Sequence, residues 1–168
     1  WEPLFFYHNT VVTAGNAWRD YYGAQLVMGT KGTKRRLFNN IFLQLDGSPG
    51  LAVPSPDDDV EAGGNLLWSV KSGPAVQGDF FAPRKAKPAL AAFGAGDIFA
   101  DPKLAHVAGE ALDIRPPGGA AVDAGVKVPA DWPDSLRTAD KGKPDIGALP
   151  LGAPMLRVGP AAAPRRAP

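Results

Sequence analysis

A short phrase returns three times in this chain, with an Asn between two short runs of strand-forming residues. It reads Tyr7-His8-Asn9-Thr10-Val11, then Phe38-Asn39-Asn40-Ile41-Phe42, then Gly63-Gly64-Asn65-Leu66-Leu67. The spacing is 31 residues from position 9 to 40 and 25 from position 40 to 65. Self-similarity at a period of about 20–50 residues is typical of stacked units that cannot bury their apolar faces alone. The repeat therefore favours a solenoid, and a parallel β-helix is the first architecture to consider.

Asn suits the corner of such a coil. A chain that passes from one flat sheet to the next must turn sharply, and the turn often needs a left-handed backbone conformation, which Gly adopts freely and Asn more readily than most residues. When coils stack about 4.8 Å apart, equivalent Asn side chains can hydrogen-bond along the stack. The sequence predicts such a ladder through Asn9, Asn40 and Asn65. Three unrelated Asn turns are the alternative.

Residues 4 to 70 are predicted to form short strands, because their apolar and β-branched runs are bounded by Gly, Asn, Pro or Asp. The expected strands are Leu4 to Tyr7, Thr10 to Thr13, Ala24 to Met28, Arg35 to Phe38, Ile41 to Leu45, Leu51 to Val53 and Leu66 to Val70. Between them we expect an aromatic and charged loop (Asn16 to Gly23), a basic loop (Thr30 to Lys34) and an acidic loop (Pro54 to Glu61). One short helix is expected near Pro88 to Phe93.

Composition narrows the possible classes of protein. The 168 residues suffice for one domain with a core, and 20 Gly with 18 Pro predict many turns. The net charge of +1 gives no indication of nucleic-acid binding. The absence of Cys excludes disulfides, thiol nucleophiles and Cys-based metal sites. The sequence contains neither an apolar stretch long enough to span a bilayer nor a recognisable signal peptide.

The chain divides into three parts by this reasoning. Residues 1–70 are expected to form β-helix coils, residues 71–150 an irregular terminal coil and cap packed on them, and residues 151–168, rich in Ala, Pro and Arg, a disordered tail. The chain enters an apolar strand directly at Leu4 without a capping unit. We therefore expect it to be the C-terminal part of a longer protein, with upstream coils as its partner. An aromatic cluster at the start that itself acts as the cap is the alternative.

Several later phrases carry a family resemblance: Asp101-Pro102, Ala121-Val122-Asp123-Ala124-Gly125 and Pro144-Asp145-Ile146-Gly147-Ala148. Together with the Asn-bearing coils, they resemble the C-terminal end of bacterial right-handed parallel β-helix proteins of the pectin-lyase-like superfamily. The resemblance covers roughly residues 4 to 150. It implies an all-β, three-faced right-handed coil, export to the periplasm, the cell surface or the medium, and binding to or action on polysaccharides.

The chain departs from this family in its closing phrases. Members commonly have Ser-Pro where this chain has Gly119-Ala120, and many have an acidic residue where it has Leu149-Pro150. Both departures concern the cap. An Asp followed two residues later by Gly can accept backbone N–H bonds while the Gly takes a positive φ. We therefore assign structural roles to Asp123, Gly125, Asp145 and Gly147.

The sequence offers surface clusters and no catalytic signature. Four cations, Lys31, Lys34, Arg35 and Arg36, are suited to neutralising an acidic glycan, and a solvated strand edge would have the same composition. The aromatic residues Trp18, Tyr21 and Tyr22, with Arg19, would give a stacking platform for sugars or would fold over the sheet edge.

Metal and His chemistry receive less support. Asp57, Asp58, Asp59 and Glu61 lack the spacing of a calcium loop and are expected to be a solvated turn. No metal site or cofactor is predicted in this chain, and Ca²⁺ stays open for the full-length protein. His8 and His106 have no Ser, Asp or second His at a recognisable catalytic spacing.

Two functions of different class follow. The first is the C-terminal part of an exported β-helix protein that binds or cleaves polysaccharide, with its main site in upstream coils. It leaves open whether the protein is a lyase, a glycoside hydrolase or no enzyme. The second is a non-enzymatic surface or adhesion module in which the β-helix is a rigid rod. A β-sandwich with fortuitous repeats is a third option for the fold, and it requires antiparallel strand pairing.

Overall fold

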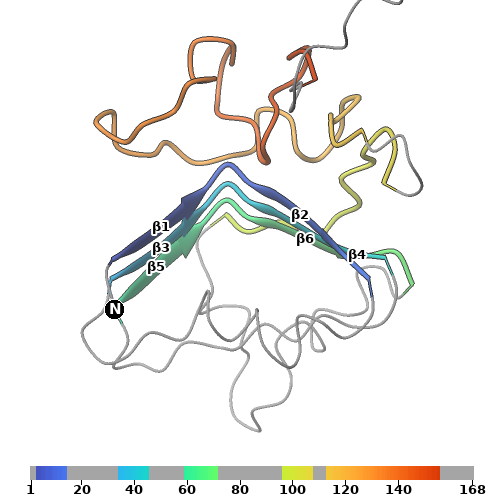
Figure 1. The fold of residues 1–168 in the computed structure, drawn as a ribbon, viewed down its shortest axis with the longest axis horizontal. Helices are drawn as coiled ribbons and strands as arrows, with labels where there is room; N and C mark the ends of the chain where they lie inside the picture. Colours follow the sequence, from blue (N-terminus) through green and yellow to red (C-terminus); the bar gives the residue numbers. More distant parts are fainter. Residues whose placement is uncertain (1–2, 15–33, 46–58, 72–95, 108–112, 156–168) are drawn as a thin grey trace, which may run out of the picture.

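The computed structural model describes residues 3–14, 34–45, 59–71, 96–107 and 113–155, and within them the fold is all-β, with no helix. Six strands form two three-stranded parallel sheets that meet at an angle, like the two slopes of a roof (Figure 1). The first sheet has the order β1-β3-β5 and the second the order β2-β4-β6. The strands are β1 (Leu4–Tyr7), β2 (Thr10–Thr13), β3 (Arg35–Phe38), β4 (Ile41–Gln44), β5 (Val60–Gly63) and β6 (Leu66–Ser69).

The strand pairing follows the sequence repeat without slippage. Leu4 pairs with Arg35 and Arg35 with Val60 in the first sheet, while Thr10 pairs with Ile41 and Ile41 with Leu66 in the second. All pairings between these strands are parallel, so the described strands are not those of an antiparallel β-sandwich. The loops between the repeats differ in length by several residues. This difference lies outside the strands and leaves their register unchanged.

The strand bounds agree closely with the sequence prediction, with three corrections. The fourth and sixth strands end one residue earlier than expected, at Gln44 and Ser69. β5 begins at Val60, inside the stretch predicted as an acidic loop, because pairing with β3 satisfies its backbone although it lacks a long apolar run. The expected strands Ala24 to Met28 and Leu51 to Val53, and the expected helix near Pro88, lie outside the described residues.

Each passage from the first sheet to the second uses the same corner. The residue directly after the strand of the first sheet has a left-handed backbone conformation, and an Asn follows that residue. The left-handed residues are His8 (φ 51°), Asn39 (φ 54°) and Gly64 (φ 62°). The corner occurs a fourth time at Gly96 (φ 78°), which Asp97 follows. There the Ile98 N–H donates to Asn65 O at 2.7 Å and the Leu67 N–H to Ile98 O at 2.9 Å, so this turn continues the stack.

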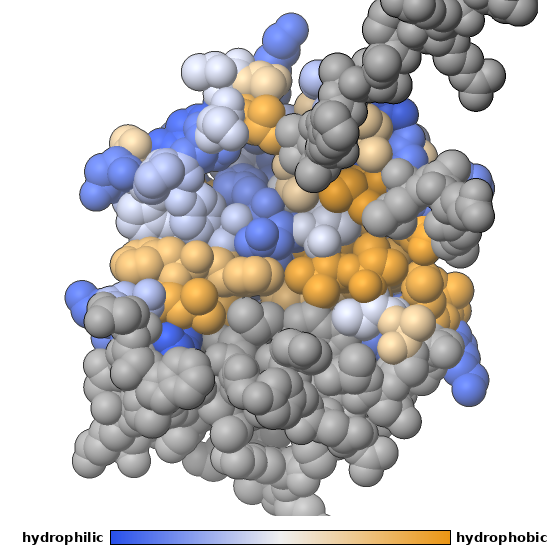
Figure 2. Space-filling view, in the orientation of Figure 1, coloured by the Kyte–Doolittle hydropathy of each residue, from blue (hydrophilic) through white to orange (hydrophobic). Residues whose placement is uncertain are grey.

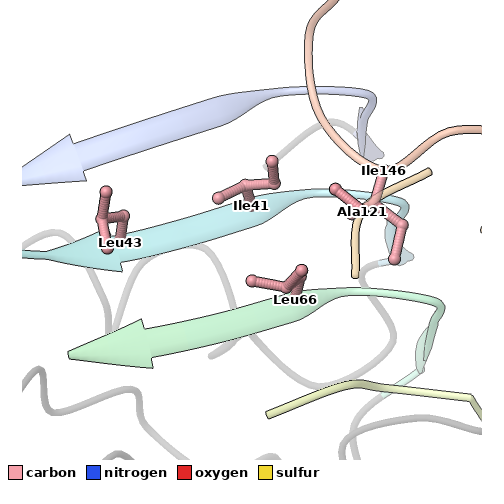
Figure 3. Close-up of a cluster of buried hydrophobic side chains, with 5 residues drawn as sticks. All are labelled: Ile41, Leu43, Leu66, Ala121 and Ile146. Atoms are coloured by element: carbon pink, nitrogen blue, oxygen red, sulfur yellow. The ribbon is translucent and has the colours of Figure 1, made fainter. Parts of the chain in front are cut away.

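One face of the second sheet carries an apolar cluster that the C-terminal segment (residues 113–155) covers. Ile41 and Leu43 of β4 and Leu66 of β6 are buried against Ala121 and Ile146 of that segment (Figure 3). Side chains alternate between the faces of a strand. Phe42 of β4 accordingly lies on the other face, where its ring stacks on Phe6 with centroids 6.3 Å apart.

The C-terminal segment runs without regular secondary structure over the outer slopes of the roof (Figure 1). In the view of Figure 2, apolar residues form a band along the strands, and hydrophilic residues gather over the left part of the segment. Trp132 is the main aromatic contact of that part, since its ring lies 4.9 Å from Phe5, 5.1 Å from Tyr7 and 6.0 Å from Phe38. The Tyr7 hydroxyl also donates to Pro133 O at 2.5 Å.

Candidate functional site

The corner side chains form a continuous hydrogen-bonded column. Asn9 Nδ2 donates to Asn40 Oδ1 at 3.1 Å, and Asn40 Nδ2 donates to Asn65 Oδ1 at 2.9 Å. The backbone N–H groups of Asn9 and Asn40 donate to the same acceptor oxygens as their own side chains. Each amide also donates to a backbone carbonyl of the first sheet or its edge, at Tyr7, Phe6 and Leu37. The column therefore satisfies the corner backbone and has a structural role.

Asp97 ends this column with a carboxylate in place of an amide. Its Oδ1 accepts both the Asn65 N–H at 2.8 Å and Asn65 Nδ2 at 3.1 Å. Its Oδ2 is buried and has no hydrogen-bond partner within the described part of the chain. Burial raises the pKa of Asp97 to about 6, and the two hydrogen bonds from Asn65 oppose that rise only in part.

A pocket of about 230 Å³ opens between the first corner and the C-terminal segment. We call it the corner pocket, and its polar lining consists of His8, Lys127, Asp134, Arg137 and Asp140. His8 comes from the corner between β1 and β2, and the other four come from the C-terminal segment. A second cavity of about 20 Å³ shares His8, Asp134, Arg137 and Asp140 with it. The pocket therefore exists only because the segment lies over this corner.

His8 is held in one orientation by Asn39. Asn39 Oδ1 accepts the Val126 N–H at 2.8 Å, so Asn39 Nδ2 faces both Val126 O at 2.7 Å and His8 Nε2 at 3.2 Å. His8 Nε2 must therefore accept a hydrogen bond, which places the proton of the neutral ring on Nδ1. Burial lowers the pKa of His8, and the carboxylates of Asp134 and Asp140 oppose this without reversing it. His8 is consequently neutral at pH 7.

Asp134 and Arg137 line the same wall but are engaged differently. Asp134 Oδ1 accepts the Leu136 N–H at 3.0 Å, while Oδ2 lies 4.0 Å from His8 Nε2 and 3.8 Å from Arg137 Nε. The Arg137 guanidinium donates to the carbonyls of Pro129, Ala130 and Trp132 at 2.9–3.1 Å. Arg137 therefore closes the loop that carries Trp132 and Asp134.

Asp140 is the second carboxylate that lines the corner pocket. Its Oδ2 accepts the Asp145 N–H at 2.8 Å. Burial raises the pKa of Asp140, and the nearby carboxylates of Asp145 and Asp123 add to the rise, while the hydrogen bond from Asp145 offsets part of it. The pocket thus combines a neutral imidazole, a carboxylate with an elevated pKa, a second carboxylate, an engaged guanidinium and the exposed Lys127.

Of the residues predicted as substrate-binding from the sequence, those that the structure describes do not line the corner pocket. Trp18, Arg19, Tyr21 and Tyr22, with Lys31, lie outside the described residues. Lys34 is exposed and Arg35 is 4% exposed. Arg36 is paired with Asp59 at 2.9 Å and with Glu61 at 3.1 Å, so its charge is balanced across β3 and β5.

The Asp and Gly residues predicted to be structural organise the C-terminal segment. Asp145 Oδ1 accepts the Asp123 N–H and Asp145 Oδ2 accepts the Leu151 N–H, both at 2.6 Å. The Gly125 N–H donates to Pro144 O at 2.7 Å, and the Gly147 N–H donates to Asn39 O at 2.8 Å. Gly147 has the expected positive φ, of 108°, whereas the positive φ of the earlier phrase lies at Asp123 (52°) and not at Gly125. A β-carbon on Gly147 would lie 2.7 Å from Ile41 Cδ1, so this Gly permits close approach to β4.

Sequence patterns do not predict the corner pocket, and among its polar lining residues they single out His8 alone. The missed signal is an imidazole at a left-handed corner that carries Asn or Gly in the later repeats. Asp134, Arg137 and Asp140 stand in a stretch with no repeat, and nothing in their spacing indicates that they meet residue 8.

Comparisons with known protein families, with curated proteins and with solved structures find no match for this chain. Among the described residues, no helix is long and apolar enough to cross a membrane. The same residues contain no group of three or more His, Asp or Glu side chains arranged to hold a metal ion.

Proposed function

We propose that this chain is the C-terminal part of an exported, right-handed parallel β-helix protein that binds polysaccharide, and that the corner pocket contributes to binding. Support for the β-helix comes from four successive left-handed corners and from parallel strands in constant register. The family resemblance of the closing phrases supports export and a polysaccharide ligand.

The observation that carries the binding role is His8 at its corner. A left-handed conformation is costly for a residue with a β-carbon, and strained residues gather at functional sites. The equivalent positions hold Asn39, Gly64 and Gly96, which relieve that cost. His8 instead lines a pocket that offers several hydrogen-bonding side chains, which are the groups that would orient a hydroxyl-rich ligand.

Titration of the chain with neutral and acidic polysaccharides tests this function. We expect the unaltered chain to bind at least one of them, and His8→Asn to weaken that binding about tenfold or more. Asn is the matched replacement because Asn39 holds the same corner conformation. His106→Asn is the control, since His106 is exposed and outside the pocket. Absence of binding, or equal binding by the His8→Asn variant, would contradict the proposal.

A non-enzymatic rod is the second candidate function. It is favoured by the pairing of Arg36 with Asp59 and Glu61, which uses a cation of the predicted glycan-binding cluster to join two strands. If the chain is a rod, substitutions in the pocket should change the stability of the fold and have no other measurable effect. The polysaccharide titration separates the two functions.

A further inference from the structure

We infer that the corner pocket binds a neutral sugar unit through its hydroxyl groups, with Asp134 and Asp140 as acceptors, and does not bind the carboxylate of a uronic acid. This inference rests on the proposed polysaccharide-binding function and specifies its ligand.

Two carboxylate oxygens of the pocket are free to accept hydrogen bonds from a ligand. Asp134 uses Oδ1 for the Leu136 N–H, and Asp140 uses Oδ2 for the Asp145 N–H. Within the described chain, Asp134 Oδ2 and Asp140 Oδ1 accept no hydrogen bond. Carboxylate oxygens require donors, and sugar hydroxyls supply them in neighbouring pairs. A uronate carboxylate has no proton to donate at neutral pH and would be repelled by both Asp side chains.

The cations of the pocket do not compensate for this repulsion. The Arg137 guanidinium donates to three backbone carbonyls and lies beside Asp134, so its hydrogen-bonding capacity is directed to the protein. Lys127 is exposed, and solvent screens its charge. His8 accepts a bond from Asn39 at Nε2, which disfavours the charged ring. A hydroxyl can both donate to a carboxylate and accept from an ammonium, whereas a carboxylate can only accept.

The size of the pocket fits one sugar ring. Its volume of about 230 Å³ lies below the roughly 300–1,000 Å³ typical of sites for drug-sized ligands. The pocket would therefore hold one unit of a longer polymer.

Binding measurements with a neutral β-glucan oligosaccharide, a neutral mannan oligosaccharide and an oligogalacturonate test the inference. We expect a neutral oligosaccharide to bind and the oligogalacturonate to bind at least tenfold more weakly. Asp134→Asn and Asp140→Asn should each weaken neutral binding about tenfold, because an amide replaces a charged acceptor. Asp131→Asn is the matched control, since Asp131 is exposed on the same segment and outside the pocket.

Three results would overturn the inference. The first is that oligogalacturonate binds more tightly than the neutral oligosaccharides and that this binding is lost in the Lys127→Gln variant. This result would leave the proposed polysaccharide-binding function in place. Neutral binding that neither Asp variant weakens would place the ligand elsewhere. Absence of binding to all three probes would remove the proposed function as well.

A second measurement does not depend on folded variants. In the unaltered chain, a neutral methyl glycoside should shift the NMR ring signals of His8 and leave those of the exposed His106 in place. Equal shifts of both rings, or of neither, would contradict binding in the corner pocket.

Discussion

His8 combines two features that oppose stability, a left-handed backbone and a partly buried titratable ring. The same corner at position 39 is held by Asn, whose short polar side chain tolerates this conformation better. The cost of His at position 8 is therefore balanced by what its ring contacts, namely Asn39 and the corner pocket.

The lowered pKa of His8 gives stability a defined pH dependence. The folded chain resists protonation of this ring, so its contribution is present above the unfolded-state pKa of about 6.5 and is lost as pH falls below it. Between pH 8 and pH 5, the free energy of unfolding measured with urea should fall more in the unaltered chain than in the His8→Asn variant. In the His106→Asn variant, the free energy of unfolding should fall as much as in the unaltered chain. Parallel pH profiles for the unaltered chain and His8→Asn would refute this role of burial.

Gly125 matters because of what lies beside it. A β-carbon there would stand 2.7 Å from Pro144 O and 2.9 Å from Asn39 Oδ1, the oxygen that orients Asn39 toward His8. Gly125→Ala should therefore cost about 2 kcal/mol or more in the free energy of unfolding. Gly152→Ala is the comparison, because no atom of the described residues lies within 4 Å of its β-carbon and its cost of about 1 kcal/mol is backbone strain alone. Equal losses would show that the tight contact at Gly125 relaxes freely.

At the scale of elements, the amide column joins four turns and ends on an acid. The raised pKa of Asp97, about 6 against 3.8, means that the folded chain binds a proton that the unfolded chain has already lost. Its contribution to stability is thus fully present below pH 3.8 and is lost as pH rises through about 6. The loss amounts to at most about 3 kcal/mol.

Asp97→Asn should remove this loss. An amide can accept the same two bonds from Asn65 and carries no charge at any of these pH values. Denaturant unfolding at pH 4 and pH 7.5 should show the variant gaining stability over the unaltered chain at the higher pH and little or none at the lower. The exposed Asp101→Asn provides the comparison for removal of a negative charge. A gain of equal size at both pH values would mean that Asp97 is not the titrating group.

The strands were predictable because the signal for them is local. Tyr7-His8-Asn9 and its later copies contain both the apolar runs and the corner residue, so residue type and spacing locate β1 to β4 and β6. β5 was missed because Val60 and Glu61 continue an acidic run and the strand depends on pairing with β3. Gly96-Asp97 was missed because a carboxylate stands where the repeat has an amide. The corner pocket depends on contacts between residue 8 and residues 127–140, which no local pattern encodes.

For the whole molecule, the C-terminal segment both completes the core and carries most of the corner pocket. Ile146 is fully buried against Ile41 and Leu66, and two residues later the Ala148 N–H donates to Thr10 Oγ1 at 3.0 Å. These contacts hold the segment across β2 and β4. The positions of Asp134 and Asp140 over His8 therefore depend on a packing contact outside the pocket.

Ile146→Ala tests this coupling. Truncation at a fully buried site should cost about 2–4 kcal/mol in the free energy of unfolding. It should also weaken binding at the corner pocket, because the segment that carries the acidic lining is anchored there. Leu151→Ala removes a similar apolar group from the same segment at a site that is 48% exposed, so it should cost less than about 1 kcal/mol and leave binding unchanged. If the two substitutions are equally mild, the segment is held by its hydrogen bonds to Asn39 and Thr10, and the apolar cluster contributes little to placing the pocket.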